Sequence, residues 1–418
     1  MPDDELKALL HMTGLDDDRG RLRFMMKLKM IVNLVLSVLL IWFLAAHEQK
    51  IRTSVASERD STAYWAAGKL LVHRQNPYSV PSVLALQRSQ GYTGDKPLML
   101  RPPPWSVWMV LPLGLLLNAY WAWVAWLVVL LASLVISIRI SWRMYGDGSR
   151  PPNVFLLAGY LFAPVVACLV AAQMGIVLLL GIALFLLLEE DHPFLAGAAL
   201  LLPLAKPHIF GLLWPVLAVW VVTRKRWSLL GGMATAFLLA LSIAVAFDPA
   251  IFHHYREMLQ QQAIQREFIP ALSGVIRAIF FRRFFWVQFV PMGLGLLWSA
   301  RFYWTNRRAW SWRRHGPALL IVSLLTTPYS WMSDEAVLLP AVLQGVLWVK
   351  GAQLKLRSQF VILIFVCLNL LLLLILRAQV SHSTGIYFWS NLVWFSWYWY
   401  ARGFSRRADR EVAESALA

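Results

Sequence analysis

Apolar segments long enough to enter a lipid bilayer recur from one end of this 418-residue sequence to the other. A helix that crosses the hydrocarbon core needs about 20 mainly apolar residues, and somewhat fewer where the bilayer thins. Hydrophobic residues make up 59% of the chain and charged residues 15%, whereas a soluble domain has about 45–50% and about 25%. This composition excludes a disordered chain, a collagen-like chain and an ordinary cytosolic enzyme. It predicts an all-α polytopic membrane protein.

The apolar stretches that are candidate spans vary in length, and several are shorter than a full crossing. They are 29–46, 104–138, 153–172, 174–188, 194–205, 209–223, 228–247, 286–300, 317–328, 335–349, 359–377 and 386–401. Paired short stretches, such as 194–205 and 209–223, are expected to be helices that meet at a cavity and do not each cross fully. The stretch 104–138 is long for one helix and short for two, so we expect an interfacial or re-entrant piece at 104–117 before one span. The total is about 10–13 crossings.

Basic residues are concentrated in loops between these stretches. The chain has 39 Lys and Arg against 22 Asp and Glu, a net charge of +17, and it also carries 22 Trp, which suits aromatic belts at both bilayer interfaces. In a soluble chain such a charge would suggest nucleic acid, but here no nucleic-acid partner is expected. Even numbers of candidate spans separate neighbouring basic loops, so the positive-inside rule places all of these loops in the cytoplasm. The loops are 139–150, 224–226, 301–314, 350–357 and 402–410.

This topology divides the chain into three parts. Residues 1–28 are too charged for a signal peptide and are expected in the cytoplasm, residues 29–401 form the transmembrane domain, and residues 402–418 form a cytoplasmic tail. The large extracytoplasmic loops are 47–103 and 248–285. The first of them carries eight Lys and Arg, which conflicts with the positive-inside rule, but the agreement of all the later basic loops outweighs it.

The first outer loop contains an aspartate with two interpretations. Ser57 begins a helical pattern, and Asp60 follows three residues later, as in a capping arrangement where a carboxylate also suits the helix dipole. Alternatively, Asp60 is a carboxylate at the membrane surface that is available as a base. Both can hold, because a helix N-terminus would keep Asp60 ionised. Three neighbours would surround it: Arg59, Tyr64 and Lys69.

Further polar residues interrupt apolar sequence and are candidates for a binding site. Arg101 leads into the next span and could hold a phosphate, or it is an interfacial anchor. Lys206 lies between two short apolar stretches, where an ionisable residue is a functional candidate unless it snorkels to the interface. His208 and Gln173 could face the same cavity, although a lone His is more often structural. Arg266, in the second outer loop, could meet phosphate or be a solvated charge.

Five segments of the chain carry motifs in an order that points to one family. RDSTAYWAAGKLLVHRQNPY and RPPPWSVWMVLPLGLLL place an Asp, an aromatic, small residues and Asn-Pro-Tyr before an Arg-Pro-Pro. AAQMGIVLLLGIALFLL, FLAGAALLLPLAKPHIF and LLTTPYSWMSDEAVLLPAVL follow. Together they resemble glycosyltransferase family 87, a GT-C family of polyprenyl-phosphate-mannose-dependent mannosyltransferases, over about residues 58 to 340. Ala172 and Gly175 replace the Gly and Asn of the family's Gly-Gln-x-Asn motif.

The resemblance implies a GT-C-type transmembrane helix bundle that works as a hexosyltransferase. It would move a hexose, with mannose expected, from a polyprenyl-phosphate sugar to a hydroxyl of a glycolipid or polysaccharide acceptor on the extracytoplasmic side. By position, Asp60 matches the family's catalytic Asp, and the reaction needs such a base together with cations or donors on the phosphate leaving group. Some family members carry a His after the Trp that corresponds to Trp331. Here Asp334 follows instead, as a candidate second acid or base, an acceptor-binding residue or a helix cap.

The resemblance also implies the partners and the location. These are membrane lipid, the lipid-linked sugar donor as co-substrate and a glycan or glycolipid acceptor, in the inner (cytoplasmic) membrane and in synthesis of the cell envelope. No cofactor or metal is expected, because the adjacent His253 and His254 would point about 100° apart on a helix and have no evident third ligand. The alternative is a multispanning transporter or flippase of lipid-linked sugars. That alternative predicts a two-fold repeat, and the sequence shows none.

Overall fold

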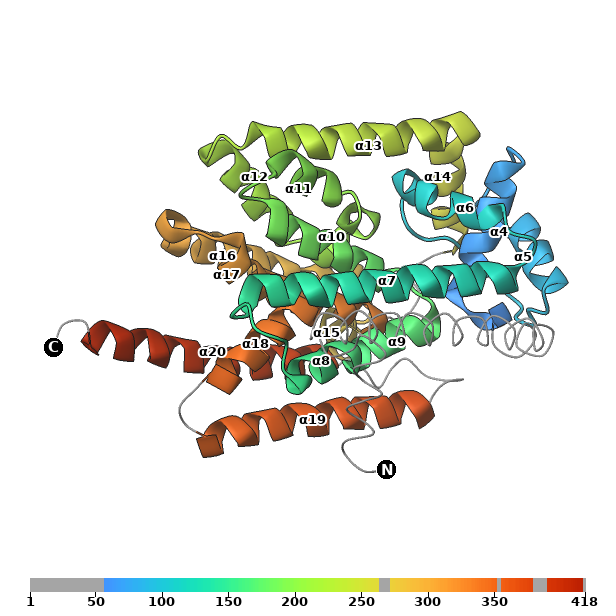
Figure 1. Cartoon of the computed structure of the whole chain (residues 1–418). Helices are drawn as coiled ribbons and strands as arrows, with labels where there is room; N and C mark the ends of the chain where they lie inside the picture. The colour runs from blue at the N-terminus through green and yellow to red at the C-terminus, as the bar shows by residue number, and fades with distance from the viewer. Residues whose placement is uncertain (1–55, 263–270, 352–354, 379–388, 416–418) are drawn as a thin grey trace, which may run out of the picture. The chain divides into compact units, whose positions relative to one another are not determined.

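The structure, a computed structural model, describes residues 56–262, 271–351, 355–378 and 389–415. Throughout these residues the chain forms helices and no strand, so the all-α fold is confirmed (Figure 1). The predicted cytoplasmic segment 1–28, the candidate span 29–46 and Arg266 lie outside the described residues.

Five helical stretches in the described part of the chain are long and apolar enough to cross a bilayer. The fold is therefore that of a polytopic membrane protein. The stretches are α7 (Ala119–Tyr145), α8 with α9 (Asn153–Tyr160 and Ala163–Ala171), α13 (Trp227–Phe247), η8 with α18 (Met332–Leu338 and Leu339–Gly351), and most of α19 (Lys355–Ala378). Shorter apolar helices lie between them: α10 (Gly175–Leu188), α11 with η3 (Pro193–Ala199 and Pro203–Ala205) and α12 (Leu213–Thr223).

The remaining helices complete the described chain. They are η1 (Ala56–Glu58), α4 (Asp60–Val72), α5 (Val80–Ser89), η2 (Pro104–Met109), α6 (Leu111–Gly114), η4 (Pro207–Phe210), α14 (Ile251–Gln262), α15 (Leu272–Phe280), η6 (Phe285–Phe289), α16 (Val290–Asn306), η7 (Arg307–Ala309), α17 (Trp312–Thr326) and α20 (Ser390–Ser415).

The ambiguous stretch 104–138 is divided by the structure. The short helices η2 and α6 come first, and the 27-residue helix α7 follows, so one long helix is preceded by a piece too short to cross. The side chain of Asn118 fixes the start of α7, because its Oδ1 accepts a hydrogen bond from the backbone N–H of Trp121 at 3.0 Å.

Three interruptions between short helices meet in the interior. The chain breaks between α9 and α10, between η3 and η4, and between α17 and η8. Helices α9 and α10 both pack against η8, and α10 also contacts η3. Irregular backbone within a membrane protein is tolerated where protein buries it or where it lines a cavity, because lipid offers no hydrogen bonds. The prediction that 194–205 and 209–223 form paired short helices agrees with this arrangement.

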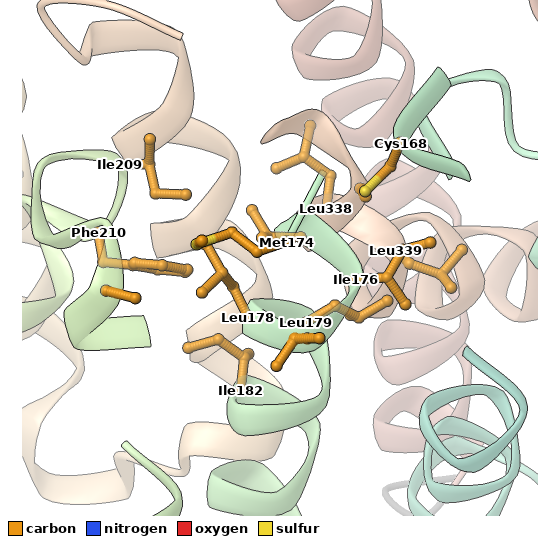
Figure 2. Packing of buried hydrophobic residues seen from close by; sticks show 14 of the residues in the cluster. Cys168, Met174, Ile176, Leu178, Leu179, Ile182, Ile209, Phe210, Leu338 and Leu339 are labelled. Carbon is orange, nitrogen blue, oxygen red and sulfur yellow. The ribbon is translucent and has the colours of Figure 1, made fainter. Parts of the chain in front are cut away.

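Buried apolar side chains hold these breaks together. Figure 2 shows Met174 and Ile176 from the start of α10 close to Leu338 and Leu339 from η8 and α18. All four are less than 2% exposed. Gly175 allows this packing, because a Cβ added there would lie only 2.5 Å from the carbonyl oxygen of Ser333. Any larger residue at this position would push the start of η8 away from α10.

The helix of the first outer loop begins later than a capping arrangement at Ser57 requires. Asp60 is the first residue of α4, and its N-cap is Arg59, whose side chain makes no capping hydrogen bond. Ser57 belongs to the separate 3-10 turn η1. The capping-box interpretation of Asp60 is therefore wrong, although its carboxylate does lie in the first turn of a helix. Helix α4 packs on α6 at two glycines, and a Cβ on Gly68 would lie 2.4 Å from the oxygen of Val110.

Ala172, where the family pattern has Gly, adopts a left-handed conformation. It ends α9 with φ 53° and ψ 39°, and its carbonyl accepts a hydrogen bond from the indole of Trp126 at 2.9 Å. Alanine tolerates this region at a cost of about 1–2 kcal/mol, whereas a β-branched side chain is a strong outlier there.

We therefore expect Ala172→Gly to keep the protein folded and Ala172→Val to lower the free energy of unfolding by about 2–3 kcal/mol. Thermal unfolding in detergent micelles measures this difference. Ala171→Val, one residue earlier and still helical, is the matched control, with a loss of about 0.5 kcal/mol. Equal losses for the two valine variants would contradict the assignment of strain to residue 172.

Candidate functional site

The three breaks surround a cavity of about 450 Å³. Six of the polar residues singled out in the sequence line it together with Asp334. They come from four separate parts of the chain, so the fold assembles them. These residues are Asp60, Tyr64, Arg101, Gln173, Lys206 and His208.

Helix α4 presents Asp60 and Tyr64 to the cavity. The two residues are four positions apart, which puts them on one face of a helix. The ring of Tyr64 is buried and packs edge-on against Trp126 of α7, with ring centroids 5.5 Å apart. This contact fixes the rotation of α4 and therefore the direction in which Asp60 points.

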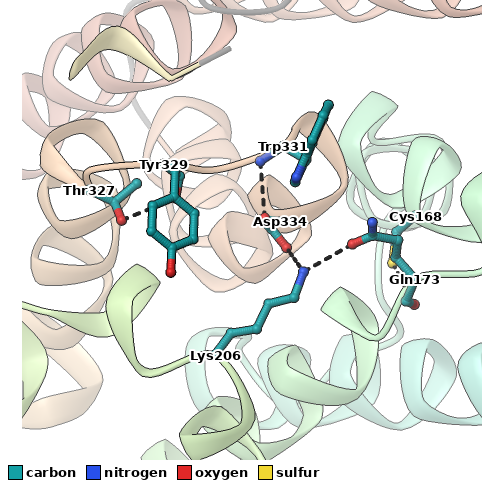
Figure 3. Close-up of polar contacts among 7 residues, drawn as sticks. All are labelled: Cys168, Gln173, Lys206, Thr327, Tyr329, Trp331 and Asp334. Atoms are coloured by element: carbon teal, nitrogen blue, oxygen red, sulfur yellow. Dashed lines mark hydrogen bonds and ion pairs between the residues drawn. The ribbon is translucent and has the colours of Figure 1, made fainter. Parts of the chain in front are cut away.

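A buried ion pair crosses the floor of the cavity. Figure 3 shows Lys206, from the turn between η3 and η4, reaching Asp334 of η8 and Gln173. The Lys206 ammonium donates to Asp334 Oδ1 at 2.6 Å and to Gln173 Oε1 at 3.0 Å. The side chain of Asp334 is 2% exposed and that of Lys206 is 14% exposed. Lys206 therefore does not snorkel to water but joins two other breaks of the chain.

Both oxygens of Asp334 accept hydrogen bonds from the protein. Oδ2 accepts from the backbone N–H of Trp331 at 3.0 Å, while Oδ1 holds Lys206. Asp334 is therefore not the cap of a helix that starts at residue 335, because Trp331 is the N-cap and Asp334 lies inside the first turn of η8. The adjacent Glu335 is bound differently, because its carboxylate accepts from the hydroxyl of Ser390 at the start of α20. The two adjacent acids therefore bind different parts of the chain: Asp334 binds Lys206, and Glu335 binds Ser390.

The carboxyl of Asp60 lies in a mixed electrostatic environment. Desolvation raises its pKa above the ordinary range, while the positive charge of Lys206, a hydrogen bond with the Gln173 side chain and the charge of Arg101 oppose that rise. The negative charge of Asp334 acts in the same direction as desolvation. A carboxyl whose pKa is raised is a stronger proton acceptor when it is ionised.

A polar clamp and an indole hydrogen bond position the wall that carries Arg101. The side chain of Gln87 donates to the carbonyl of Leu98 at 2.7 Å and accepts from its N–H at 2.9 Å, so it replaces a strand partner for this extended segment. The indole of Trp105 donates to the carbonyl of Leu204 at 2.9 Å. The Arg-Pro-Pro-Pro-Trp motif is thereby tied to the turn that carries Lys206.

Aromatic side chains form another part of the lining. His208 packs on Tyr329, with ring centroids 4.1 Å apart and planes inclined by 33°. Burial lowers the pKa of His208 to about 4, with Lys206 acting in the same direction, so the imidazole is neutral at physiological pH. Tyr255 of α14 donates its hydroxyl to the carbonyl of Arg101 at 3.0 Å. A neutral His, tyrosines and Trp331 offer hydrogen bonds and flat apolar faces to a ligand.

Two residues suggested by the sequence do not line the cavity. Lys69 is nine residues after Asp60, and at 100° per residue it lies on the opposite side of α4. Arg59 precedes the helix as its N-cap, and its Nε is buried with no hydrogen-bond partner among the described residues. The expectation that both surround Asp60 in the site is therefore not met.

Sequence reasoning missed some of the lining. Tyr255 lies in the second outer loop, close to His253 and His254, and it lines the cavity together with Leu259. The spacing of Tyr255 and Leu259, four residues apart on α14, is the feature of the sequence that places them on one helical face. Tyr329 was part of a recognised segment but was not singled out. In the described part of the chain no group of three His, Cys, Asp or Glu has the geometry to hold a metal ion.

Comparison with known proteins identifies the family. The sequence profile of glycosyltransferase family 87 matches residues 102–332, more than half of the chain. The chain belongs to glycosyltransferase family 87. It is thus a membrane glycosyltransferase. No curated protein and no solved structure matches the chain.

The family match covers part of the cavity lining. It includes Gln173, Lys206 and His208, ends just before Asp334, and begins after Asp60 and Arg101. The structure brings the residues inside and outside the matched range into one cavity of this glycosyltransferase.

The Lys206–Asp334 pair should contribute strongly to stability. Asp334→Asn leaves a buried ammonium without its counter-ion, so we expect the free energy of unfolding to fall by about 3 kcal/mol, measured by thermal or denaturant unfolding in micelles. The double variant Lys206→Met with Asp334→Asn should recover part of that loss.

The exposed pair of His253 and Glu257, 3.1 Å apart, provides the control. Glu257→Gln should change stability by less than about 0.5 kcal/mol. If Asp334→Asn costs no more than Glu257→Gln, the ion pair does not hold the three breaks together.

Proposed function

We propose that this glycosyltransferase moves a hexose, with mannose as the expected sugar, from a polyprenyl-phosphate donor to an acceptor hydroxyl on the extracytoplasmic side of the inner membrane. The observation that carries the proposal is the convergence of two carboxyl groups, two cations and a neutral imidazole on a single cavity within a membrane fold. The acceptor in this proposal is a glycan or glycolipid, and no metal or other cofactor takes part.

Asp60 is the base in this proposal. The acceptor oxygen attacks the anomeric carbon of the sugar, its proton passes to Asp60, and the bond from that carbon to the phosphate oxygen breaks. The phosphate leaves with the bonding electrons. A phosphate ester is already an activated leaving group, so the protein has to supply a proton acceptor and positive charge.

Lys206 and Arg101 would receive the phosphate. Both line the cavity, and the positive charge of each lowers the pKa of Asp60, which supports a phosphate site beside this carboxyl. Gln173 hydrogen-bonds both the Asp60 carboxylate and Lys206, and so links the proposed base to the proposed phosphate site.

Asp334 takes a different role from the second acid or base suggested by the sequence. Its oxygens already accept from Lys206 and from the backbone of Trp331. We therefore assign it to holding Lys206 in place and to tuning its charge. His208, neutral and stacked on Tyr329, is assigned to a hydrogen bond with a sugar hydroxyl.

Asp60→Asn should abolish hexose transfer while the protein still folds and inserts, because the amide cannot accept the proton. A loss of about 100-fold to 10,000-fold is expected for removal of a general base. The assay uses purified protein in micelles with radiolabelled polyprenyl-phosphate mannose and an acceptor extract.

Asp95→Asn is the matched control, since Asp95 is an exposed aspartate of the same loop and does not line the cavity. Undiminished transfer by Asp60→Asn would remove Asp60 as the base. If the wild-type enzyme transfers from no polyprenyl-phosphate hexose, the proposed donor is wrong. If it only moves lipid-linked sugars between leaflets of vesicles, the flippase alternative holds.

The pH dependence of transfer should show one ascending limb that belongs to Asp60. The base must be ionised, and its raised pKa places this limb above about pH 4, the ordinary range of an aspartate. Lys206→Gln removes the charge that most strongly opposes the rise in the pKa of Asp60. The ascending limb of the pH profile should therefore move to higher pH, and the maximal rate of transfer should fall. Lys96→Gln, an exposed residue of the same loop, should leave the limb unchanged. A limb that does not move with Lys206→Gln would mean that another group titrates.

The sidedness of the site can be tested by labelling one cysteine. Thr93, exposed in the loop after α5, is replaced by Cys in a Cys367→Ser background, while the fully buried Cys168 stays. An impermeant maleimide added to intact cells should label Thr93→Cys. Labelling that requires broken cells would place this loop, and the cavity with it, on the cytoplasmic side.

A further inference from the structure

Exposed aromatic and basic side chains gather on the segment that runs from the end of α15 through η6. Phe280 is 70% exposed, Phe284 55% and Trp286 64%, and Arg282 and Arg283 between them are exposed as well. No Asp or Glu occurs in the sequence between Glu267 and Asp334. Residues 279–289 are called the aromatic-basic segment here.

Helix α16 shows where this segment lies relative to a bilayer. Its 17 residues rise about 25 Å, close to the thickness of a hydrocarbon core of about 30 Å. One face of the helix exposes Leu294 and Leu297, and Arg301 is exposed on the same face one turn later. At its far end Trp304 is 63% exposed and stacks under the guanidinium of Arg307 at 4.2 Å.

Exposed aromatic side chains lie at both ends of α16. Trp286 and Phe289 stand at the near end, and Trp304 with Arg307 stands at the far end. Amphipathic rings and arginines prefer the headgroup level on each side of a bilayer. The exposed rings of Trp286 and Phe289 therefore suit the headgroup level at the near end of this face.

The aromatic-basic segment is also attached to the wall of the cavity. The hydroxyl of Ser273 in α15 donates to the carbonyls of Thr327 and Pro328, at 2.7 and 2.8 Å. The side-chain amide of Gln288 in η6 also donates to the carbonyl of Pro328. The next residue, Tyr329, lines the cavity. A lipid headgroup held by this segment would therefore lie beside that wall.

We infer that residues 279–289 form a docking surface for the anionic phosphate headgroups of the bilayer, with the aromatic rings inserted at the interface and Arg282 and Arg283 on the phosphates. Charge complementarity selects this occupant, since the segment carries only positive side chains and the headgroups carry the negative charge. Arg277 supports the arrangement from α15, where its guanidinium lies 5.4 Å from the ring centre of Phe285. The inference does not depend on the sugar or on the acceptor.

The depth of a spin label tests this surface. A nitroxide is attached at Phe284→Cys in the Cys367→Ser background, and the protein is placed in nanodiscs of phosphatidylcholine with or without phosphatidylglycerol. We expect the label to collide with oxygen more than with a water-soluble nickel chelate. Removal of phosphatidylglycerol should shift the label toward water. Arg282→Gln and Arg283→Gln should each do the same and lower the population of inserted label about fivefold.

Arg307→Gln with Arg308→Gln, at the other end of α16, is the matched control and should leave the label at position 284 unchanged. A label that collides mainly with the nickel chelate in every nanodisc would overturn the inference. A label shielded from both reagents would also overturn it, because a protein partner or a second copy would then cover the surface. Depth that is independent of lipid charge and of both arginines would remove the headgroup contact.

Discussion

The ion pair between Lys206 and Asp334 is the contact on which the interior of this protein depends. Lys206 lies on one break between short helices, Asp334 lies in η8 just after a second break, and Gln173, which accepts from the same ammonium, lies on a third. Without the pair, the turn at 205–208 would leave a charge in an apolar bundle and η8 would lose the interaction that orients its first turn. The cost of desolvating the two charges is therefore offset by their mutual attraction, which joins two distant segments of the chain and places both side chains in the cavity.

This arrangement explains why the apolar segments are short. A continuous helix satisfies its own backbone and leaves nothing for a ligand, whereas a broken helix frees polar groups that must be buried in protein or turned to a cavity. In this glycosyltransferase the breaks at 172–174, 206 and 327–331 do both. The buried apolar packing of Met174 and Ile176 against Leu338 holds α10 against η8 where the helices are interrupted.

Much of this could be predicted from the sequence, and the reasons for the rest are physical. Asp60 and Tyr64 share a helical face by their spacing, and Lys206 and Gln173 stood out as polar residues in apolar sequence. Lys69 is close to Asp60 in sequence, but the rotation of the helix over nine residues puts it on the opposite side of α4. The start of α4 at Asp60 depends on the separate turn η1, which has no distinct signal. Tyr255 and the close approach of Gly175 to Ser333 arise from tertiary packing that no single segment encodes.

The contact between Gly68 of α4 and Gly114 of α6 determines which wall of the cavity can change shape. The two backbones are in contact there, so α4 has no room to slide or tilt against α6. Asp60 lies eight residues before Gly68, about 12 Å along the same helix, and its position is fixed with it. The opposite wall, residues 97–103, is extended chain held by the side chain of Gln87 and by single hydrogen bonds from Trp105 and Tyr255. Substitutions in that extended wall would therefore change the shape of the cavity while α4 keeps the Asp60 carboxyl in place.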